Sequence, residues 1–135
     1  MSVALAVREE AMFCVSAVEA VDFAARAELE GGCAVTSLTG NADLRVKDRL
    51  ATFLEEVDQE VDRLQLTEVT VDLRALEFMN SSCFKDFVSW IAAVQARPTE
   101  RHYSITFRSN PRMHWQRRSL NALCCFASDL VSVQS

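Results

Sequence analysis

The chain has 135 residues, of which half are hydrophobic and 24% charged, with only three Gly and two Pro. This composition is typical of one folded domain and excludes a disordered or low-complexity chain. The formal net charge of −5 argues against a nucleic-acid partner, because proteins that bind a phosphate backbone usually carry a basic face.

The cysteines and the first residues bear on the compartment. Five cysteines, an odd number without a CxxC pair, indicate neither a disulfide framework nor a zinc site, and we expect no metal or cofactor. Buried thiols in a reducing compartment are the simpler interpretation. No basic segment of a signal peptide opens the chain, and Arg8, Glu9 and Glu10 interrupt its first apolar run. We therefore expect a cytoplasmic protein without a membrane span.

The N-terminal part is predicted to form a hairpin. Residues 1–20 fit either a first strand or an extension. Residues 11–29 are rich in Ala and Glu, as a helix would be, but they also fit the first strand of a hairpin. We favour the strand, because Gly31-Gly32 indicates a tight turn before the β-rich residues 33–40.

The middle of the chain contains the clearest helix. Apolar side chains recur every three or four positions over residues 46–64, and charged residues take the other positions, which predicts an amphipathic helix. Asn41 or Asp43 is predicted to cap its start. The β-branched residues 68–73 then predict a central strand, and a second helix follows and ends near Pro98.

The last third continues the alternation. Residues 102–107 alternate like a strand, Asn110 and Pro111 suggest the start of a third helix, and residues 129–133 suggest the last strand. Strands that alternate with helices imply right-handed βαβ crossovers. We therefore predict an α/β fold in a single domain, residues 1–135, with helices packed on a central sheet that the early hairpin makes mixed.

A group of small polar residues separates the central strand from the second helix, within LEFMNSSCFKDFV (residues 76–88). In α/β sheets this carboxyl end of a strand is where ligands and chemistry usually lie. Asn80 or Ser81 is the natural N-cap, and the free N–H groups and the helix dipole favour an anion there. A phosphate on Ser81 would suit the position, with Lys85 one turn further on. A cap without any further role explains the same residues.

The residues around this turn resemble the central signature of STAS domains, the anti-sigma-factor-antagonist family. The stretch VTVDLRALEFMNSSCFKDFVSWIAAV follows the family's order of an hhhDL strand, an xxhxFhDSSG turn and a helix. The likeness extends over about residues 20–135. It implies a STAS-like fold and a non-enzymatic regulator in a bacterial partner-switching pathway. The family's phospho-acceptor directly follows the Asp of the turn, which implies Ser81, with Ser82 as the second choice.

Two positions depart from the family pattern, since Asn80 replaces its Asp and Cys83 its Gly. The motif FxNSSCxK is closer to the SiaC-type branch, whose members regulate diguanylate cyclases. The resemblance implies a serine protein kinase of the anti-sigma-factor type or a diguanylate cyclase as partner, and a serine phosphatase that reverses the modification. We expect Asn80, Cys83, Lys85 and Trp115 to bind the phosphate or the partner.

An enzyme is an alternative from the residues alone, as is a STAS scaffold without phosphorylation. Cys83 at a helix start could have a lowered thiol pKa and act as a nucleophile. His102 or His114 would then supply a base, oriented by Asp86 or Asp72. Against this interpretation, the chain has no nucleophile elbow, no Gly-rich loop and no metal-ligand spacing.

A basic stretch near the C-terminus permits a nucleic-acid interpretation. Arg112, Arg117 and Arg118 lie beside Trp115, and a basic stripe with an aromatic residue can bind a single strand. In an acidic protein the same arginines fit a solvated face or a protein contact better. Trp115 is then a candidate anchor for a partner, because Trp and Arg are common at binding hot spots.

Overall fold

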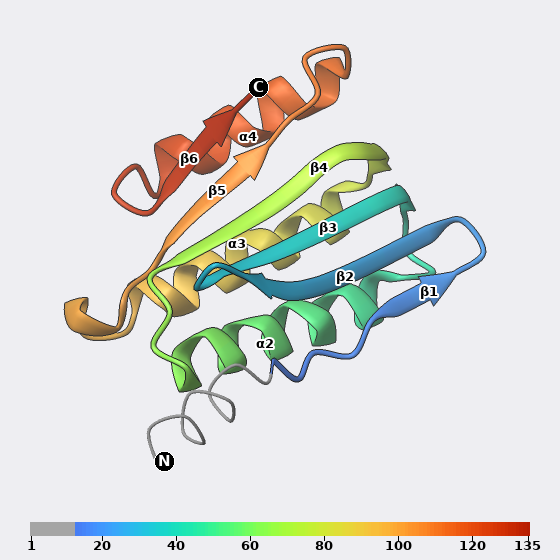
Figure 1. Ribbon diagram of the computed structural model, residues 1–135. Helices are drawn as coiled ribbons and strands as arrows, with labels where there is room; N and C mark the ends of the chain where they lie inside the picture. The colour runs from blue at the N-terminus through green and yellow to red at the C-terminus, as the bar shows by residue number, and fades with distance from the viewer. Residues whose placement is uncertain (1–12) are drawn as a thin grey trace.

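A computed structural model describes residues 13–135 (Figure 1). The elements are β1 (Val18–Ala20), β2 (Phe23–Glu30), β3 (Cys33–Ala42), α2 (Lys47–Arg63), β4 (Glu68–Met79), α3 (Ser81–Gln95), a 3-10 turn (Thr99–Arg101), β5 (Ser104–Arg108), α4 (His114–Phe126) and β6 (Val131–Gln134). The predicted order of strands and helices is confirmed. The part of the expected N-terminal strand or extension that precedes residue 13 lies outside the described residues.

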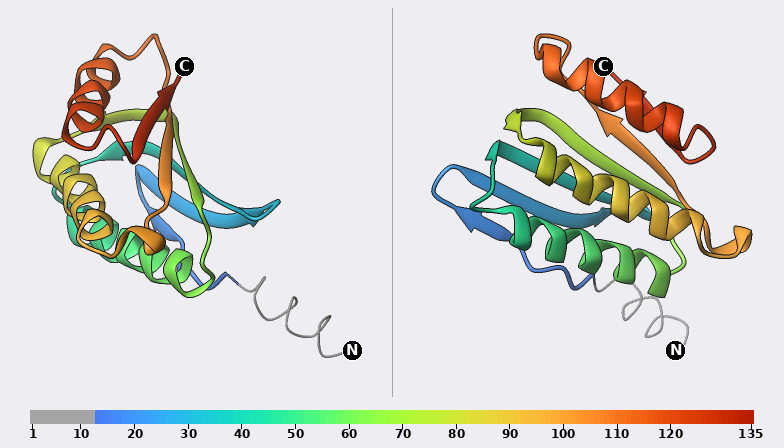
Figure 2. Two further views of the ribbon diagram at one scale, coloured as in Figure 1. Left: turned by 90° about the vertical axis from the view of Figure 1, so that its left-hand side faces the viewer. Right: turned by 180° about the vertical axis from the view of Figure 1, so that it is seen from behind.

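The six strands form one mixed sheet in the order β1-β2-β3-β4-β5-β6. The first three strands are antiparallel neighbours, and β3 to β6 are parallel. Each parallel pair is connected through a helix, and α2, α3 and α4 lie on the same face of the sheet (Figure 2). Right-handed crossovers that progress in one direction produce this arrangement. It brings the loops after β3 and β4 to the same end of the molecule (Figure 1).

The core lies between the sheet and the helices. Helix α2 buries the predicted apolar stripe, including Leu50 and Phe53, and α3 buries Phe87 and Ile91. Phe87 packs edge-on against Phe107 of β5, with ring centroids 5.4 Å apart. Burial of this apolar surface holds the helices on the sheet and so fixes where α3 begins.

A polar network joins the C-terminal halves of α2 and α3 to the residue before β5. The Tyr103 hydroxyl donates to Asp58 Oδ1 at 2.6 Å and accepts from Trp90 Nε1 at 2.7 Å. The Arg97 guanidinium pairs with the other oxygen of Asp58. Burial, followed by the Asp58 carboxylate, raises the pKa of Tyr103 well above its ordinary value, so the hydroxyl stays a proton donor.

Strand β4 is longer than the predicted strand 68–73 and extends to Met79. Its inward residues change from every second to every third position at Leu73, Leu76 and Met79, and the pairing with β3 shifts register there. A strand with such irregularities does not show the alternation by which a sequence reveals it. The extension carries the chain directly to the polar turn.

A buried glutamine supports this second half of β4. Strand β5 pairs with β4 only as far as Asp72. Beyond Asp72, the side chain of Gln116 from α4 forms hydrogen bonds to the β4 backbone instead of a neighbouring strand. Gln116 Nε2 donates to the carbonyl oxygens of Leu73 and Leu76 at 2.7 and 3.0 Å, and its Oε1 accepts from the Asn110 N–H at 2.8 Å. The side chain is fully buried. Helix α4 thereby holds the part of β4 that leads to the turn.

The predicted cap of α2 is wrong. The helix begins at Lys47, and neither Asn41 nor Asp43 caps it. Asn41 Nδ2 instead donates to Asp22 Oδ2 at 2.6 Å, and Asp43 Oδ1 accepts from the Arg45 N–H at 2.9 Å. The short side chains make local or cross-strand bonds that compete with capping.

The predicted start of α4 is wrong for the same reason. The helix begins at His114, after the turn that contains Asn110 and Pro111. Asn110 Oδ1 accepts from the Arg112 N–H at 3.0 Å, a side-chain-to-backbone bond to the second residue ahead that forms an Asx turn. The cap-like pair therefore precedes the helix instead of opening it.

Candidate functional site

The polar turn is a helix N-terminus fixed to the neighbouring strand. Strand β4 ends at Met79, and Asn80 caps α3 with its Oδ1 accepting from the Cys83 N–H at 2.8 Å. The Asn80 N–H donates to the Ala42 carbonyl at the end of β3, at 2.9 Å. The predicted cap is confirmed for Asn80, and its backbone and side chain are both held in place.

Ser81 is the first residue of α3, and its side chain is exposed, whereas Ser82 is half-buried. Lys85, also exposed, lies four residues after Ser81 and therefore on the same side of the helix. By the same spacing Ser82 lies one turn before Asp86. Lys85 is also three residues after Ser82 and so lies within one turn of both serines, but only the Ser81 side chain is exposed. Within residues 13–135 Lys85 has no ion-pair partner that would compete for a phosphate.

The cap gives a direct test of how this turn is held. Asn80→Ala should lower the free energy of unfolding by about 1 kcal/mol, because the Cys83 N–H loses its acceptor. Chemical denaturation measures the difference. Asn121→Ala, at an exposed position inside α4, is the matched control and should be neutral or slightly stabilising. Equal stabilities of the two variants would contradict the role of Asn80.

Cys83 is not the nucleophile that one alternative requires. Its side chain is fully buried, and its Sγ donates to the Asp43 carbonyl oxygen at 3.3 Å. Burial, followed by the Asp86 carboxylate, raises the pKa of the Cys83 thiol to about 11. The expectation of a lowered pKa is therefore wrong, because burial outweighs the helix terminus. The expectation that Cys83 contacts a phosphate or partner does not hold for its buried side chain.

The thiol chemistry can be checked by alkylation. At about pH 8, iodoacetamide should modify the exposed Cys14 and Cys125 while Cys83 stays unmodified, because a buried thiol well below its pKa is a poor nucleophile. Peptide mass spectrometry over time gives the order of modification, with the denatured protein as the control in which all thiols react. If Cys83 were alkylated first in the folded protein, the enzyme interpretation would return.

The other members of the proposed catalytic set are dispersed. His102 Nε2 bonds to the Arg97 carbonyl at 2.8 Å, and His114 opens α4 with an exposed side chain. Asp72 is bound to Arg74, with which it forms a 2.8 Å ion pair. Asp86 alone lies close to Cys83, one turn further along α3, and its charge opposes thiolate formation. The structure thus does not assemble the set.

A partly buried ion pair connects the first residue of α2 to the second turn of α3. Lys47 Nζ lies 2.8 Å from Asp86 Oδ1, with Lys47 34% and Asp86 9% exposed. The hydrogen bond to Asp86 raises the pKa of Lys47 above its ordinary value. Removal of Lys47 would leave the Asp86 carboxylate with little solvent around it, so the pair helps to fix how α2 and α3 face each other.

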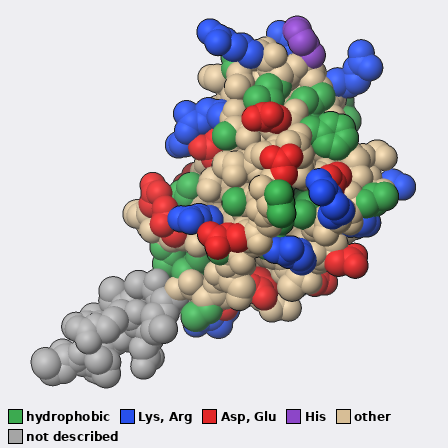
Figure 3. All heavy atoms as spheres, turned by 90° about the vertical axis from the view of Figure 1, so that its right-hand side faces the viewer, with side chains coloured by type: hydrophobic (Ala, Val, Ile, Leu, Met, Phe, Trp, Pro, Cys, Tyr) green, Lys and Arg blue, Asp and Glu red, His purple; other side chains and the backbone are tan. Residues whose placement is uncertain are grey.

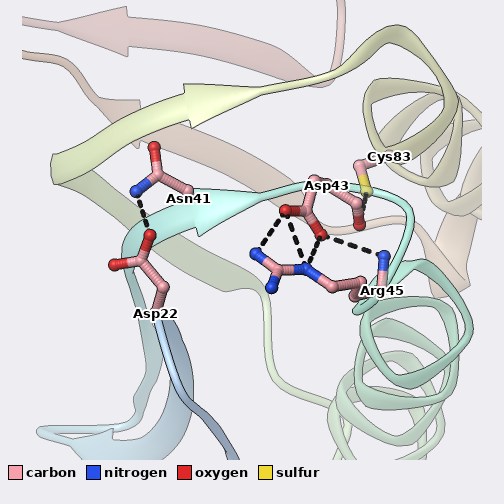
Figure 4. Close-up of polar contacts among 5 residues, drawn as sticks. All are labelled: Asp22, Asn41, Asp43, Arg45 and Cys83. Atoms are coloured by element: carbon pink, nitrogen blue, oxygen red, sulfur yellow. Dashed lines mark hydrogen bonds and ion pairs between the residues drawn. The ribbon is translucent and has the colours of Figure 1, made fainter.

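The end of β3 is bound to Asp22, and the β3–α2 loop that follows is bound to Cys83 of α3 (Figure 4). Gly40 has a φ of +89°, and a Cβ at this position would lie 2.2 Å from the Asp22 carbonyl oxygen, so only glycine fits. This close approach lets the Asn41 N–H donate to the same oxygen at 2.7 Å. Further along the loop, hydrogen bonds from Arg45 lower the pKa of Asp43, which stays ionised.

Exposed apolar side chains lie on the segments next to the turn. Val21, Leu44 and Phe78 are 101%, 69% and 47% exposed. Val21 is next to Asp22, whose carbonyl oxygen accepts from the Asn41 N–H near the end of β3. Leu44 is next to Asp43, whose carbonyl oxygen accepts from Cys83 Sγ. Phe78 of β4 is paired with Asn41 of β3. Figure 3 looks onto this end of the molecule, where hydrophobic side chains lie among charged ones. We name Val21, Leu44, Phe78 and Ser81 the turn surface.

The sequence did not identify the apolar part of the turn surface. Leu44 lies in a polar loop, and Phe78 lies near the end of β4. At neither place does a large apolar residue contribute to a predicted buried face of a helix or strand. The one sequence signal for this surface was Leu44, an apolar residue in a loop. Only the structure shows that Val21, Leu44 and Phe78 lie at the same end of the molecule.

Trp115 and the basic stretch belong to α4. The Trp115 side chain is half-buried against the core, and its indole N–H is buried without a partner among the described residues. Arg112, Arg117 and Arg118 are exposed. Trp115 thus contributes mainly to packing of α4, while the arginines present a solvated surface.

Two further features concern membranes and metals. None of the helices within residues 13–135 is long and apolar enough to span a bilayer. In the same residues, no three His, Cys, Asp or Glu side chains come together in a way that would hold a metal ion.

Comparison with known proteins supports the fold. No protein-family model and no curated protein matches this sequence. The structure is similar to the crystal structure of an anti-sigma factor antagonist from Mycobacterium paratuberculosis, with a TM-score of 0.60 and 18% sequence identity over 81% of this chain and 86% of that chain. The chain therefore has the mixed α/β fold of an anti-sigma factor antagonist, the STAS-type fold that the motif implied.

Proposed function

We propose that the protein is a non-enzymatic regulator that binds a partner protein through the turn surface, and that reversible phosphorylation of Ser81 controls this binding. The observation that carries the proposal is the position of Ser81, exposed at the first residue of a capped helix. The similarity to the Mycobacterium antagonist supports a role in partner switching.

Exposure favours a phosphate at Ser81 over one at Ser82, because the Ser81 side chain is exposed and the Ser82 side chain is half-buried. The start of α3 presents free backbone N–H groups and the positive end of the helix dipole. Lys85 lies within one turn of both serines, and Asp86, four residues after Ser82, is already paired with Lys47. A phosphate adds up to about two negative charges, which the helix start and Lys85 would attract at either serine, so it is the exposure of Ser81 that favours this residue as the acceptor.

The same phosphate would oppose binding of a partner. Leu44 and Phe78 offer apolar area that a partner can cover, and Ser81 belongs to the same surface. Lys85 offers one positive charge against up to about two negative charges of the phosphate, so burial of the phosphate under a partner is costly and a partner that fits the unmodified surface would be released. Phosphorylation at this place therefore works as an off switch without any rearrangement of the fold.

We infer that the partner is a serine kinase of the anti-sigma-factor type, which would both bind the surface and modify it. A diguanylate cyclase is the alternative that the FxNSSCxK motif implies. In either pathway a serine phosphatase would restore the binding state. These assignments rest on the resemblance of the motif and on the fold.

Capture from lysate tests the proposal. The immobilised wild-type chain is incubated with lysate of its source cells, once with ATP and once without. We expect one protein to be retained without ATP and released with ATP, and the bait to carry phosphate after release. Retention that does not respond to ATP would indicate a scaffold without phosphorylation and would overturn the switch.

A further inference from the structure

Positive charge gathers at the start of α4, although the chain as a whole is acidic. Residues 104–128 contain four arginines and no Asp or Glu, whereas the rest of the chain has ten basic and 19 acidic residues. Arg112 lies in the turn before the helix, and Arg117 and Arg118 lie in its first two turns. All three side chains are exposed. In Figure 3, Lys and Arg side chains gather at the top of the view, where α4 begins.

These three arginines differ from the earlier ones in that their charge is not compensated. Of the seven described arginines before residue 104, six form ion pairs with carboxylates: Arg26, Arg45, Arg63, Arg74, Arg97 and Arg101. The seventh, Arg49, donates to the Glu19 carbonyl oxygen at 2.7 Å. Within residues 13–135, the side chains of Arg112, Arg117 and Arg118 form neither an ion pair nor a hydrogen bond. Their guanidinium groups are therefore available to an acceptor outside this chain.

The exposed side of α4 continues from the arginines to apolar residues. Arg118, Ala122 and Phe126 follow one another in steps of four and therefore lie along one side of the helix. Phe126 is 46% exposed, and Ala122 and Cys125 are exposed beside it. No other described element covers this side, since α4 lies at the edge of the helix layer (Figure 2). We name Arg117, Arg118, Ala122, Cys125 and Phe126 the α4 face.

The make-up of the α4 face favours an acidic protein segment over a nucleic acid. A guanidinium pairs with a carboxylate through two parallel hydrogen bonds, and an exposed apolar side chain offers area that a protein partner can cover. A phosphate backbone would use the arginines but not the apolar half of the face. A nucleic acid also extends beyond the arginines and would meet the acidic rest of the chain. A short segment with a few carboxylates contacts the α4 face alone.

We propose that the α4 face binds a protein segment that carries carboxylates at one end and apolar side chains at the other. The carboxylates pair with Arg117 and Arg118, and the apolar part lies on Ala122 and Phe126. Because the charge pairs stay close to solvent, they contribute mainly to specificity and to the rate of association, and the affinity falls as salt is raised. The α4 face shares no residue with the turn surface and does not depend on phosphorylation of Ser81.

Fluorescence anisotropy with a labelled peptide tests the α4 face. The peptide has about 14 residues, the length of α4 when helical, with glutamates in its first half and leucines in its second. The control peptide has glutamine in place of glutamate. At about 50 mM salt we expect the Glu peptide to bind saturably and at least about tenfold more tightly than the Gln peptide. Equal binding of the two peptides, or no saturable binding, overturns the proposal.

A DNA duplex of about 20 base pairs, titrated under the same conditions, tests the other class of polyanion. We expect it to bind more weakly than the Glu peptide. If the duplex binds more tightly and its binding is lost with Arg117 and Arg118, the α4 face is a nucleic-acid site and the proposal is wrong.

Variants at exposed positions identify the α4 face as the origin of the effect. The double variant Arg117→Gln, Arg118→Gln should weaken binding of the Glu peptide at least about tenfold, and Phe126→Ser about fivefold because apolar contact area is lost. The matched control combines Arg26→Gln with Arg49→Gln, which removes two exposed positive charges elsewhere. It should bind within about twofold of the wild type. If the control loses as much affinity as the α4 variant, net charge decides the binding and the α4 face is not a site, whatever the outcome at Ser81.

Discussion

The Ser81→Asp variant is expected to bind the captured partner at least about tenfold more weakly than the wild type, and Ser81→Ala to bind as tightly as the unmodified protein. The aspartate places a charge on the turn surface, where a partner would have to bury it. Alanine removes the hydroxyl that a kinase needs and adds no charge. Isothermal titration calorimetry with the purified partner measures both.

The loss of binding would not come from unfolding. Asp is favourable in the first turn of a helix, by about 0.3 to 1 kcal/mol, so Ser81→Asp should unfold at or slightly above the wild-type temperature. Ser132→Asp, on an exposed position of β6, adds the same charge elsewhere and should leave binding unchanged. If Ser81→Asp and Ser81→Ala bind the partner alike, phosphorylation at this residue does not control the interaction.

The largest loss of stability is expected at Gln116. Gln116→Met keeps the size of the side chain but leaves the buried carbonyl oxygens of Leu73 and Leu76, and the partly buried Asn110 N–H, without a partner. An unsatisfied buried group costs about 1–3 kcal/mol, so we expect a loss of about 3 kcal/mol or more in the free energy of unfolding. Urea denaturation measures it.

An exposed glutamine serves as the control for this effect. Gln59→Met on α2 should change stability by no more than about 0.5 kcal/mol. A Gln116→Met variant as stable as Gln59→Met would show that β4 does not need α4 for its second half. Because that half leads directly to Asn80, we also expect Gln116→Met to weaken partner binding.

The elements that follow one rule of periodicity were predictable from the sequence. Helix α2 was expected over residues 46–64 and is found at Lys47–Arg63, because its apolar stripe is complete. Strand β4 was expected to end at 73, since its next inward residues are spaced by three. Its extension depends on Gln116, which is more than thirty residues away in the sequence and bonds to backbone atoms.

The site was predictable only as far as local chemistry decides it. Asn80 caps α3 because its side chain bonds three residues ahead, and the motif contains this information. Asn41, Asp43 and Asn110 have equally suitable side chains, yet each bonds elsewhere. The burial of Cys83 could not be foreseen, since it depends on where the β3–α2 loop places the Asp43 carbonyl.

Phosphopeptide mapping of the protein isolated from its own cells tests the central claim most directly. Trypsin cleaves after Arg74 and Lys85, so residues 75–85 form one peptide that contains Ser81 and Ser82. We predict a phosphate on this peptide, and fragmentation should place it on Ser81. If the protein is phosphorylated only at other residues, or stays unmodified while its partner is released, then Ser81 is not the switch.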